Sequence, residues 1–490
     1  MKRSKFSLSN YKLTTFDQGE LIPVGLTEVL PGDTLQQSTS ALIRLSPLVR
    51  PVMHPVHVRI HHWFVPHRLI WDEWDDFITG GPNGTSTPAL PTWTVNPTEG
   101  SLHDYMGLPI GSSITFSMLP FRGYNLIWNE FYRDEDLQTA LAIKLTSGSD
   151  STTATDLQNV CWSKDYFTTA RPWTQKGSEV TLPLGSTAPV ERVTNAPAWD
   201  VYDAGTDTKH TGASVNITAD TGGYIREEGG SQQFSLDPKT GLQADLSGAS
   251  AASINDIREA FALQRYKEAR ARYGSRYTEY LRYLGVKSSD ARLQRPEYLG
   301  GGRQTIQFSE VLQTGVDSTD AGVGNLKGHG ISAMRSNRWR KFFEEHGYVF
   351  TLMSILPIPV YMQGIPKHFI KSTKEDFWQK ELETIGQKEI ENREVYSAHT
   401  TPTGTFGFQD RYDEYRRGVN CVSGEFRSTL KDWHMGREFT SDPALNATFV
   451  KSNPTTRIYA SSSTDQIQVM AHNSIQARRL VRKTGTPGGV

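Results

Sequence analysis

Cysteine is almost missing from this chain, because only Cys161 and Cys421 occur among its 490 residues. The two form no CxxC pair and no metal-ligand pattern, so a disulfide framework is excluded and a reducing compartment, or a fold without covalent cross-links, is favoured. No apolar run approaches the ~18 residues of a membrane-spanning helix. No charged and apolar leader opens the chain either. The sequence therefore predicts a soluble protein without membrane insertion.

An excess of charge is also lacking, since 52 Lys and Arg are balanced by 53 Asp and Glu. A protein that binds nucleic acid or a membrane over its whole surface would be strongly basic, so any such contact must be local. Catalytic signatures are missing as well: we find no GxSxG elbow, HExxH, P-loop or Cys–His arrangement at a known spacing. The residues give no positive case for an enzyme, a cofactor or a metal.

Two local clusters allow a chemical interpretation beside a structural one. Histidines gather between residues 54 and 67, but on a strand Arg59 would lie between His57 and His61 on one face, which disfavours a bound cation. Residues 71–78, reading WDEWDDFI, could place two carboxylates beside sugar-stacking tryptophans. A short helix with an acidic first turn accounts for the same residues more completely.

The most unusual stretch lies at residues 253–303, where arginines and tyrosines are interleaved on two expected helices separated by Gly274 and ended by Gly285. A turn-rich strip is expected at 290–302. Arg with Tyr suits nucleic-acid stacking and phosphate neutralisation, and it equally suits a protein–protein contact. The candidates for an inter-subunit or DNA-facing surface are Arg265, Tyr266, Arg270, Arg272, Tyr273, Arg276, Tyr277 and Arg295.

Both ends of the chain are basic. No acid occurs from residue 471 onward, so the C-terminal tail is a candidate phosphate-binding arm, as is the short basic N-terminus. A solvated, disordered tail remains the alternative for each. The candidate nucleic-acid-binding residues are Lys2, Arg3, Lys5, Arg478, Arg479, Arg482 and Lys483.

Short strands with long irregular connections dominate the rest of the chain. Strands are expected at residues 21–30, 41–45, 52–65, 114–119, 304–313 and 347–362, and helices at 121–137 and 377–390. Residues 178–247 differ in composition, being rich in Gly, Thr, Ser and Asp, and are expected to form an exposed insertion. The pattern predicts an antiparallel β-sandwich or jelly roll that carries helices in its connections.

Several long blocks resemble the major capsid protein of microviruses, which are small tailless single-stranded-DNA phages, and the gokushovirus-like branch in particular. The blocks are FVPHRLIWDEW (64–74), LPFRGYNLIWNEFYRD (119–134), DYFTTARPWTQKG (165–177), SRYTEYLRYLGV (275–286) and DARLQRPEYLGGG (290–302), with EVLPGD at 28–33. Weaker similarity continues through EEHGYVF (344–350) and FGFQDRYDEYR (406–416). The insertion at 178–247 and the chain beyond about residue 439 match no common pattern.

The resemblance implies an eight-stranded antiparallel jelly roll at residues 20–439, a basic N-terminal arm at 1–19 and a C-terminal arm at 440–490. It also implies a T=1 icosahedral homo-oligomeric shell around single-stranded DNA, a DNA pilot protein, and a scaffolding protein during assembly in the bacterial host cytoplasm. The insertion would project at the three-fold axes of the virion and meet a host surface receptor. Neither a cofactor nor a catalytic residue is implied.

Two other functions remain as alternatives. A monomeric single-stranded nucleic-acid-binding protein would account for the Arg- and Tyr-rich helices, and its affinity would fall steeply with salt. A β-sandwich carbohydrate-active enzyme would account for the tryptophans, and it would need a catalytic carboxylate pair.

Overall fold

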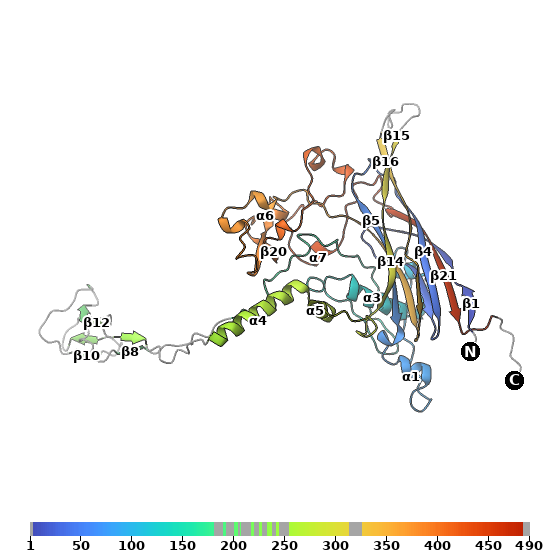
Figure 1. The fold of residues 1–490 in the computed structure, drawn as a ribbon, viewed down its shortest axis with the longest axis horizontal. Helices are drawn as coiled ribbons and strands as arrows, with labels where there is room; N and C mark the ends of the chain where they lie inside the picture. Colours follow the sequence, from blue (N-terminus) through green and yellow to red (C-terminus); the bar gives the residue numbers. More distant parts are fainter. Residues whose placement is uncertain are drawn as a thin grey trace. The chain divides into compact units, whose positions relative to one another are not determined.

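The computed structural model describes residues 3–180, 254–312 and 326–483, together with short segments between residues 190 and 244. The chain divides into two compact units, one formed by Met1–Lys176 with Glu268–Val490 and the other by Gly177–Lys267. Antiparallel β-structure dominates the first unit, as Figure 1 shows. The mainly β class expected from the sequence is thus confirmed.

One sheet of the first unit has seven strands, most of them contributed by the two ends of the chain. β21 lies between β4 on one side and both β1 and β2 on the other, and β4 in turn pairs with β16 and β17. The strands are β1 (Ser4–Ser7), β2 (Asn10–Phe16), β4 (Thr34–Leu45), β15 (Gln307–Leu312), β16 (Leu326–Arg335), β17 (Trp339–Phe342) and β21 (Ile467–Arg479).

The second sheet has four strands in the order β14-β5-β18-β3. Their bounds are β3 (Ile22–Val29), β5 (Val56–Pro66), β14 (Glu297–Thr305) and β18 (Gly347–Pro357). β18 is the most buried of them, which agrees with its nearly continuous apolar sequence. A strand covered on both faces needs apolar residues at successive positions, not only at alternate ones.

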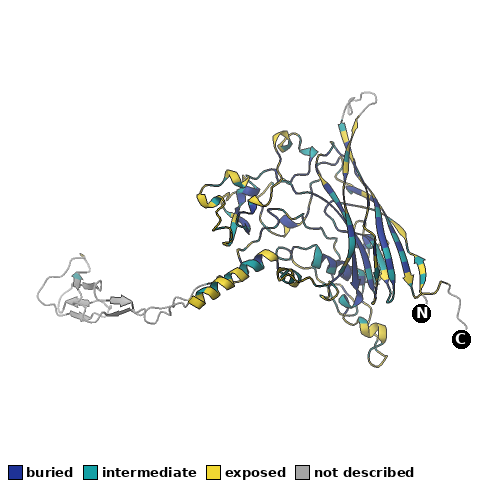
Figure 2. Ribbon diagram, viewed as in Figure 1, coloured by how far each residue is buried: buried dark blue, intermediate teal, exposed yellow. Residues whose placement is uncertain are grey.

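The two sheets pack face to face around one apolar core. Ile43 and Val469 of the seven-stranded sheet lie in the same buried cluster as Val58, Ile60 and Ile355 of the four-stranded sheet. Buried and exposed residues alternate along β4, β16 and β21, as expected for a sheet with one face on the core and one on the solvent (Figure 2). The first unit is therefore a β-sandwich.

Helix α3 (Leu119–Phe131) packs against the outer side of β18. Its backbone approaches β18 closely at Gly123, where an added Cβ would lie 2.7 Å from the ring of Phe350. The neighbouring Arg122 is fully buried and ion-paired with Asp150 at 2.8 Å, and it donates to two backbone carbonyls. A buried arginine is tolerated here because its donors have partners.

The long connections carry small elements. The connection that follows β5 contains, ahead of α3, the helices α1 (Trp74–Thr79) and α2 (Leu102–Met106) and the hairpin of β6 (Thr92–Val95) with β7 (Ile114–Ser117). The connection from β18 to β21 contains β19 (Gln387–Glu391) paired with β20 (Thr405–Asp410), α6 (Asn392–Val395) and α7 (Ala447–Val450). Its Phe406 and Phe449 pack in one apolar cluster with Tyr166 and Phe167 of the earlier connection.

The two helices expected between residues 253 and 285 are α4 (Ile254–Tyr273) and α5 (Tyr277–Tyr283). Gly274 and Gly285 follow them with φ of 96° and 80°, the left-handed conformation that glycine adopts without strain. Both predicted helix ends are therefore confirmed.

The second unit contains short strands. β10 (Ile217–Ala219), β11 (Ile225–Glu227), β12 (Gln233–Asp237) and β9 (Asp200–Asp203) form a four-stranded sheet, and β8 (Val190–Arg192) pairs with β13 (Leu242–Ala244). Most side chains of the predicted insertion 178–247 lie outside the described residues.

Two expectations about local structure are wrong. The amphipathic helix expected at 377–390 is absent: the chain forms turns until Gly386, with φ of 60°, and then enters β19, because pairing with β20 outweighs the helical pattern. The turn-rich strip expected at 290–302 ends early, since its last residues belong to β14. An added Cβ at Gly301 would lie 2.2 Å from the carbonyl oxygen of Ile60, so this glycine serves strand pairing.

Candidate nucleic-acid interface

The two basic ends of the chain lie side by side in the seven-stranded sheet. β1 pairs antiparallel with the C-terminal end of β21, which places Lys5 directly opposite Arg478 and Ser4 opposite Arg479. Both Lys5 and Arg478 are exposed. The sheet therefore joins two basic segments that are separated by more than four hundred residues in the sequence.

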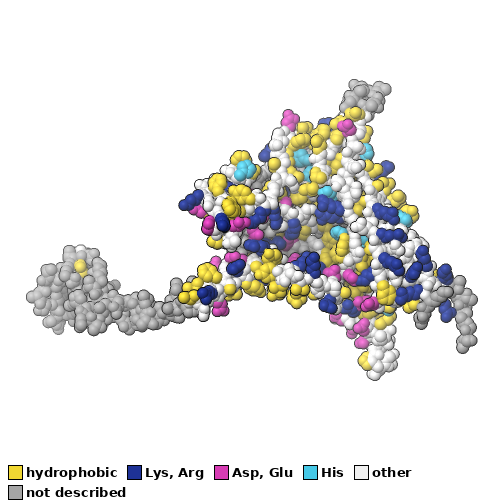
Figure 3. All heavy atoms as spheres, viewed as in Figure 1, with side chains coloured by type: hydrophobic (Ala, Val, Ile, Leu, Met, Phe, Trp, Pro, Cys, Tyr) yellow, Lys and Arg dark blue, Asp and Glu magenta, His cyan; other side chains and the backbone are white. Residues whose placement is uncertain are grey.

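Further cations follow on the same solvent face. Arg340 of β17 is opposite Gln36, Arg335 of β16 is opposite Ser40, and Arg44 projects from β4 beside Gln468. None of the outward positions of β1, β2, β4, β16, β17 and β21 carries an acid. Figure 3 shows Lys and Arg side chains gathered along this flank of the sandwich. We call this surface the basic sheet face; its cations are Lys5, Arg44, Lys327, Arg335, Arg340 and Arg478.

The arrangement of Lys5 and Arg478 favours an anion between or above them. Like charges directly opposite each other on neighbouring strands are destabilising. Among the residues that the structure describes, neither side chain forms an ion pair with a carboxylate. A DNA phosphate would remove the repulsion and release counterions at the same time.

An apolar and aromatic platform lies in the middle of the same face. The ring of Tyr11 stacks on that of His472, with centroids 4.3 Å apart. Beside it, Leu13, Met470 and Leu42 lie on one cross-strand row and are all exposed. They line a cavity of about 510 Å³. Flat aromatic and apolar surface beside cations is what unpaired bases stack on.

The other candidates at the chain ends differ in their environments. Arg479 points inward, where it forms an ion pair at 2.9 Å with the fully buried Asp33. Burial raises the pKa of Asp33, and Arg479 partly opposes that effect. Arg3 lies over the ring of Phe342 at 4.8 Å. The remaining candidates Arg482 and Lys483 are exposed, and Lys2 lies outside the described residues.

The arginines of the central helices mostly have partners inside the chain. Arg272 pairs with Asp410 at 2.7 Å, and Arg295 is buried against Asp290 at 3.0 Å with its guanidinium over Phe131. Arg276 donates to the backbone carbonyls of Asn129 and Arg133. Arg276 and Arg295 hold α5 and its flanking segments to the end of α3, and Arg272 holds the end of α4 to the last residue of β20. They are therefore poorly placed to neutralise phosphates.

Of the five remaining candidates of the central stretch, four are exposed and Arg270 is half-buried. Arg270 lies over the ring of Tyr280 at 5.0 Å, and Tyr273 lies near Tyr283. Tyr277 is 65% exposed. Arg265 and Tyr266 are also exposed on α4. Their positions fit an inter-subunit contact as well as a DNA contact.

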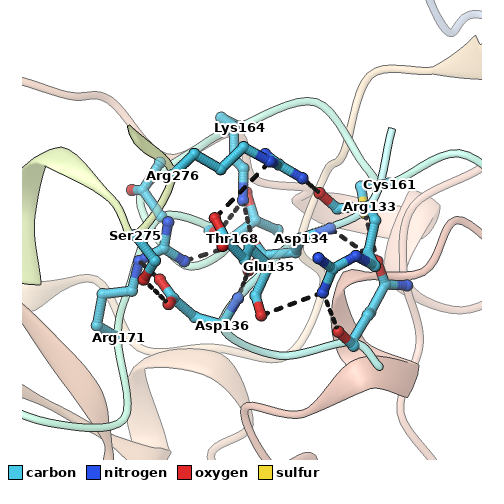
Figure 4. A network of polar contacts seen from close by, with 12 residues as sticks. Arg133, Asp134, Glu135, Asp136, Cys161, Lys164, Thr168, Arg171, Ser275 and Arg276 are labelled. Carbon is cyan, nitrogen blue, oxygen red and sulfur yellow. Dashed lines mark hydrogen bonds and ion pairs between the residues drawn. The ribbon is translucent and has the colours of Figure 1, made fainter. Parts of the chain in front are cut away.

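A polar network beneath Arg276 fixes this region (Figure 4). Lys164 and Arg171 bind Asp134, while Arg171, Lys176 and Ser275 bind Asp136. Burial opposes ionisation of the two carboxyls, but their cationic and hydrogen-bonding partners outweigh it, so both pKa values lie below the ordinary value. The network is an internal clamp between the end of α3 and the start of α5.

The histidines between residues 54 and 67 form hydrogen bonds with other residues of the chain. His61 bonds Tyr132 at 2.7 Å, His62 bonds Thr351 and Ser336 at 3.0 Å, and His54 bonds the carbonyl of Ile358 at 2.8 Å. Burial lowers the pKa of His54 and His61 to about 4 and that of His62 to about 3. Across the described part of the chain, no three His, Cys, Asp or Glu side chains converge as metal ligands would.

Comparison with known proteins agrees with the resemblance. A family model described as "Capsid protein (F protein)" matches residues 1–488. Capsid protein VP1 of Bdellovibrio phage phiMH2K is 36% identical over 471 residues, covering 92% of this chain and 88% of that protein. Capsid protein VP1 of Chlamydia phage 1 is 33% identical, covering 92% and 90%. The protein of the same name from Spiroplasma virus 4 is 30% identical, covering 99% and 95%.

The chain belongs to the capsid protein (F protein) family. The resemblance carried by blocks such as 119–134 and 290–302 is thus confirmed. Members of a capsid family are structural proteins that assemble with copies of themselves into the shell of a virion. No helix in the described segments has both the length and the apolar character needed to cross a bilayer.

Sequence reasoning identified Lys5 and Arg478 but missed the other four cations of the basic sheet face, Arg44, Lys327, Arg335 and Arg340. Arg44, Arg335 and Arg340 lie on three different strands and are far apart in the sequence. The available signal was the alternation of inward and outward positions along a strand. In each strand, the sequence neighbours of the arginine occupy inward positions, so the arginine occupies an outward one. Alternation assigns a face to each residue, but it does not tell which strands are neighbours.

Proposed function

We propose that this chain is the major capsid protein of a small single-stranded-DNA phage and builds a T=1 icosahedral shell with its basic sheet face toward the genome. The observation that carries the DNA-facing assignment is Lys5 directly opposite Arg478 on a face where the outward positions of β1, β2, β4, β16, β17 and β21 carry no acid; the acids Glu99, Asp104 and Asp465 lie at the cavity beside Leu13 and Met470. A shell must contact DNA on one side only, which agrees with a balanced total charge and a local concentration of cations.

The strand order supports an eight-stranded jelly roll. In chain order the eight long strands are β2, β3, β4, β5, β14, β16, β18 and β21. The first pairs with the eighth, the eighth with the third and the third with the sixth; the second sheet joins the second, seventh, fourth and fifth. This alternation between two sheets is the order expected of the double Greek key in a viral capsid domain, and it supports the proposed jelly roll.

The remaining partners follow from the resemblance. We propose a DNA pilot protein in the virion, a scaffolding protein during assembly in the bacterial cytoplasm, and a host surface receptor. The insertion 178–247 would form the three-fold protrusion that meets the receptor. Its place within the separate unit Gly177–Lys267 supports this proposal, because a separate unit can change without disturbing the sandwich.

Electron microscopy of the purified protein, with absorbance at 260 and 280 nm on the same sample, tests the shell. We expect uniform small isometric particles, with nucleic acid in the filled ones. A protein that stays monomeric in the presence of its scaffolding protein would contradict the proposal.

Two variants separate the assignments within the proposal. Deleting residues 178–247 should leave particle formation intact and abolish adsorption to the host, so loss of assembly would overturn the assignment of the insertion. Replacing Lys5 and Arg478 by glutamine should leave the shell intact and reduce its nucleic-acid content, because two phosphate-binding positions are lost.

A further inference from the structure

A second pair of like charges lies on the opposite side of the sandwich from the basic sheet face. Arg59 of β5 is directly opposite Arg303 of β14, and Ser354 of β18 is opposite Arg59 on its other side. The neighbouring Val58 and Ile60 point into the core, so Arg59 points away from it. The cross-strand row formed by Arg303, Arg59 and Ser354 therefore presents two guanidinium groups and one hydroxyl as hydrogen-bond donors, and it contains no acid.

Arg59 has no acidic partner. Its guanidinium donates to the hydroxyl of Ser163 at 3.4 Å, and among the described residues it forms no ion pair. Burial and the nearby Arg303 both lower its pKa. A half-buried arginine without a carboxylate is unusual, because burying a charge is costly unless it is paired. Arg303 is exposed, and within the described ranges it too forms no ion pair.

Arg59 lines a cavity of about 500 Å³. The volume lies within the range of pockets that hold small organic ligands. One wall is apolar and includes Phe131, Trp162 and Leu356. Donors on the other walls include the hydroxyls of Ser163 and Ser354. The cavity thus combines an apolar wall with a few convergent donors.

The charges around the cavity also favour an anion. The lining cations are Arg59, Arg133, Lys164 and Arg276, against the single acid Asp134. That acid is already bound by Lys164 and by Arg171 (Figure 4). The adjacent His57 and His61 have pKa values lowered first by burial and then by the arginines, so neither offers a negative or a basic partner near neutral pH.

We propose that this cavity binds a compact oxyanion of the phosphate class, either free or carried on a small organic group. The oxyanion would lie at the edge of the cavity, where Arg59 and Ser163 line it and Arg303 on the neighbouring strand is directly opposite Arg59; it would accept from both arginines and from the hydroxyl of Ser163. Guanidinium groups bind phosphate oxygens in pairs, so two opposed arginines suit this ligand better than a single cation would. The site is distinct from the DNA-facing surface, since it lies on the other sheet.

The test is calorimetric titration of the full-length, unassembled protein at constant ionic strength. The probes are inorganic phosphate, deoxycytidine monophosphate and an oligothymidylate. We expect saturable binding of one phosphate-class probe per chain. Arg59→Gln and Arg303→Gln should each weaken it about tenfold or more. Arg292→Gln is the matched control, because Arg292 is exposed and does not line the cavity, so its substitution should leave binding unchanged.

The probes also distinguish the two sources of the oxyanion. Equal affinity for phosphate and for the monophosphate assigns the free ion, whereas tighter binding of the monophosphate assigns an oxyanion on an organic group. Absence of binding by both, binding that survives both substitutions, or binding of the oligothymidylate alone would overturn the proposal.

Thermal unfolding provides a second measurement, for which no substitution of the half-buried Arg59 is needed. Arg303 is exposed, so Arg303→Gln should fold. At the same concentration, phosphate should raise the Tm of the unsubstituted protein more than that of Arg303→Gln. In chloride alone, Arg303→Gln should not lower the Tm, because it removes a repulsion; a lower Tm together with a retained phosphate response would contradict the proposed site.

Discussion

Lys5 and Arg478 face each other across two neighbouring antiparallel strands, although one lies near the beginning of the chain and the other near its end. Their neighbours Ser4 and Arg479 are paired in the same way, but Arg479 points to the interior and binds Asp33. Adjacent arginines in one strand thus have different roles, because successive side chains point to opposite faces of a sheet. One stabilises the fold, and the other is free to bind an anion.

The double variant Lys5→Gln/Arg478→Gln should bind single-stranded DNA with a weaker salt dependence. Each removed phosphate contact lowers the slope of log K against log salt by about 0.7 for a single strand. The slope can be measured by fluorescence titration of a labelled oligonucleotide with the unassembled protein. Arg292→Gln should keep the original slope, and an unchanged slope in the double variant would show that DNA binds elsewhere.

Replacing Arg479 by methionine should destabilise the protein by about 3 kcal/mol, because Asp33 would remain buried without its cationic partner. Denaturant unfolding of the unassembled protein measures the change. Arg478→Met, one residue earlier, should stay within about 0.5 kcal/mol of the original, since its side chain is exposed. Equal effects of the two substitutions would refute the inward assignment of Arg479.

Gly123→Ala should destabilise the protein by about 1–3 kcal/mol, although alanine is the better helix former. The added methyl group would lie 2.7 Å from the fully buried ring of Phe350, which cannot move without disturbing the core. Combining Gly123→Ala with Phe350→Leu should recover part of the loss in the same unfolding experiment. A neutral or stabilising effect of Gly123→Ala alone would mean that α3 can shift on β18.

The unfolding free energy should fall as the pH is lowered from about 6.5, where His62 of an unfolded chain takes up a proton. In the folded protein, burial lowers the pKa of His62 to about 3. Between this pH and about 6.5, protonation of His62 therefore favours the unfolded state. One such group contributes a slope of up to about 1.4 kcal/mol per pH unit.

The variant His62→Gln isolates this contribution. Its unfolding free energy should depend less on pH between 6.5 and 5 than that of the original protein, in denaturant titrations of the unassembled chain. His368→Gln is the matched control, because His368 is exposed. A variant His62→Gln with the original slope would show that His62 is not the group responsible.

Local sequence signals predicted those elements whose neighbours in the chain also stabilise them. Gly274 and Gly285 were expected to end two helices, and they do so because a left-handed residue can terminate a helix without help from elsewhere. The apolar run of β18 was also expected as a strand. By contrast, residues 377–390 have a helical pattern but form turns and a strand, because β20 supplies a pairing partner.

The last strand was the largest omission. β21 was expected to be part of a C-terminal arm, yet it pairs along almost its whole length with β4. Its inward positions include Ala471, Asn473 and Ala477, which are small or polar and give a weak apolar alternation. Asn473 is fully buried because its amide bonds Thr39 and the carbonyl of Val24. Such partners are visible only in the folded chain.

The sequence by itself determined the β-rich class, the two central helices, the family, and the basic character of both chain ends. Each of these follows from local pattern or from long blocks of similarity. Only the tertiary structure decided which cations share a surface. It brought Lys5 to Arg478 and Arg59 to Arg303, and it turned Arg479 inward. The physical reason is that alternation assigns a face to each residue, whereas the neighbours on that face are set by strand pairing over long distances in the chain.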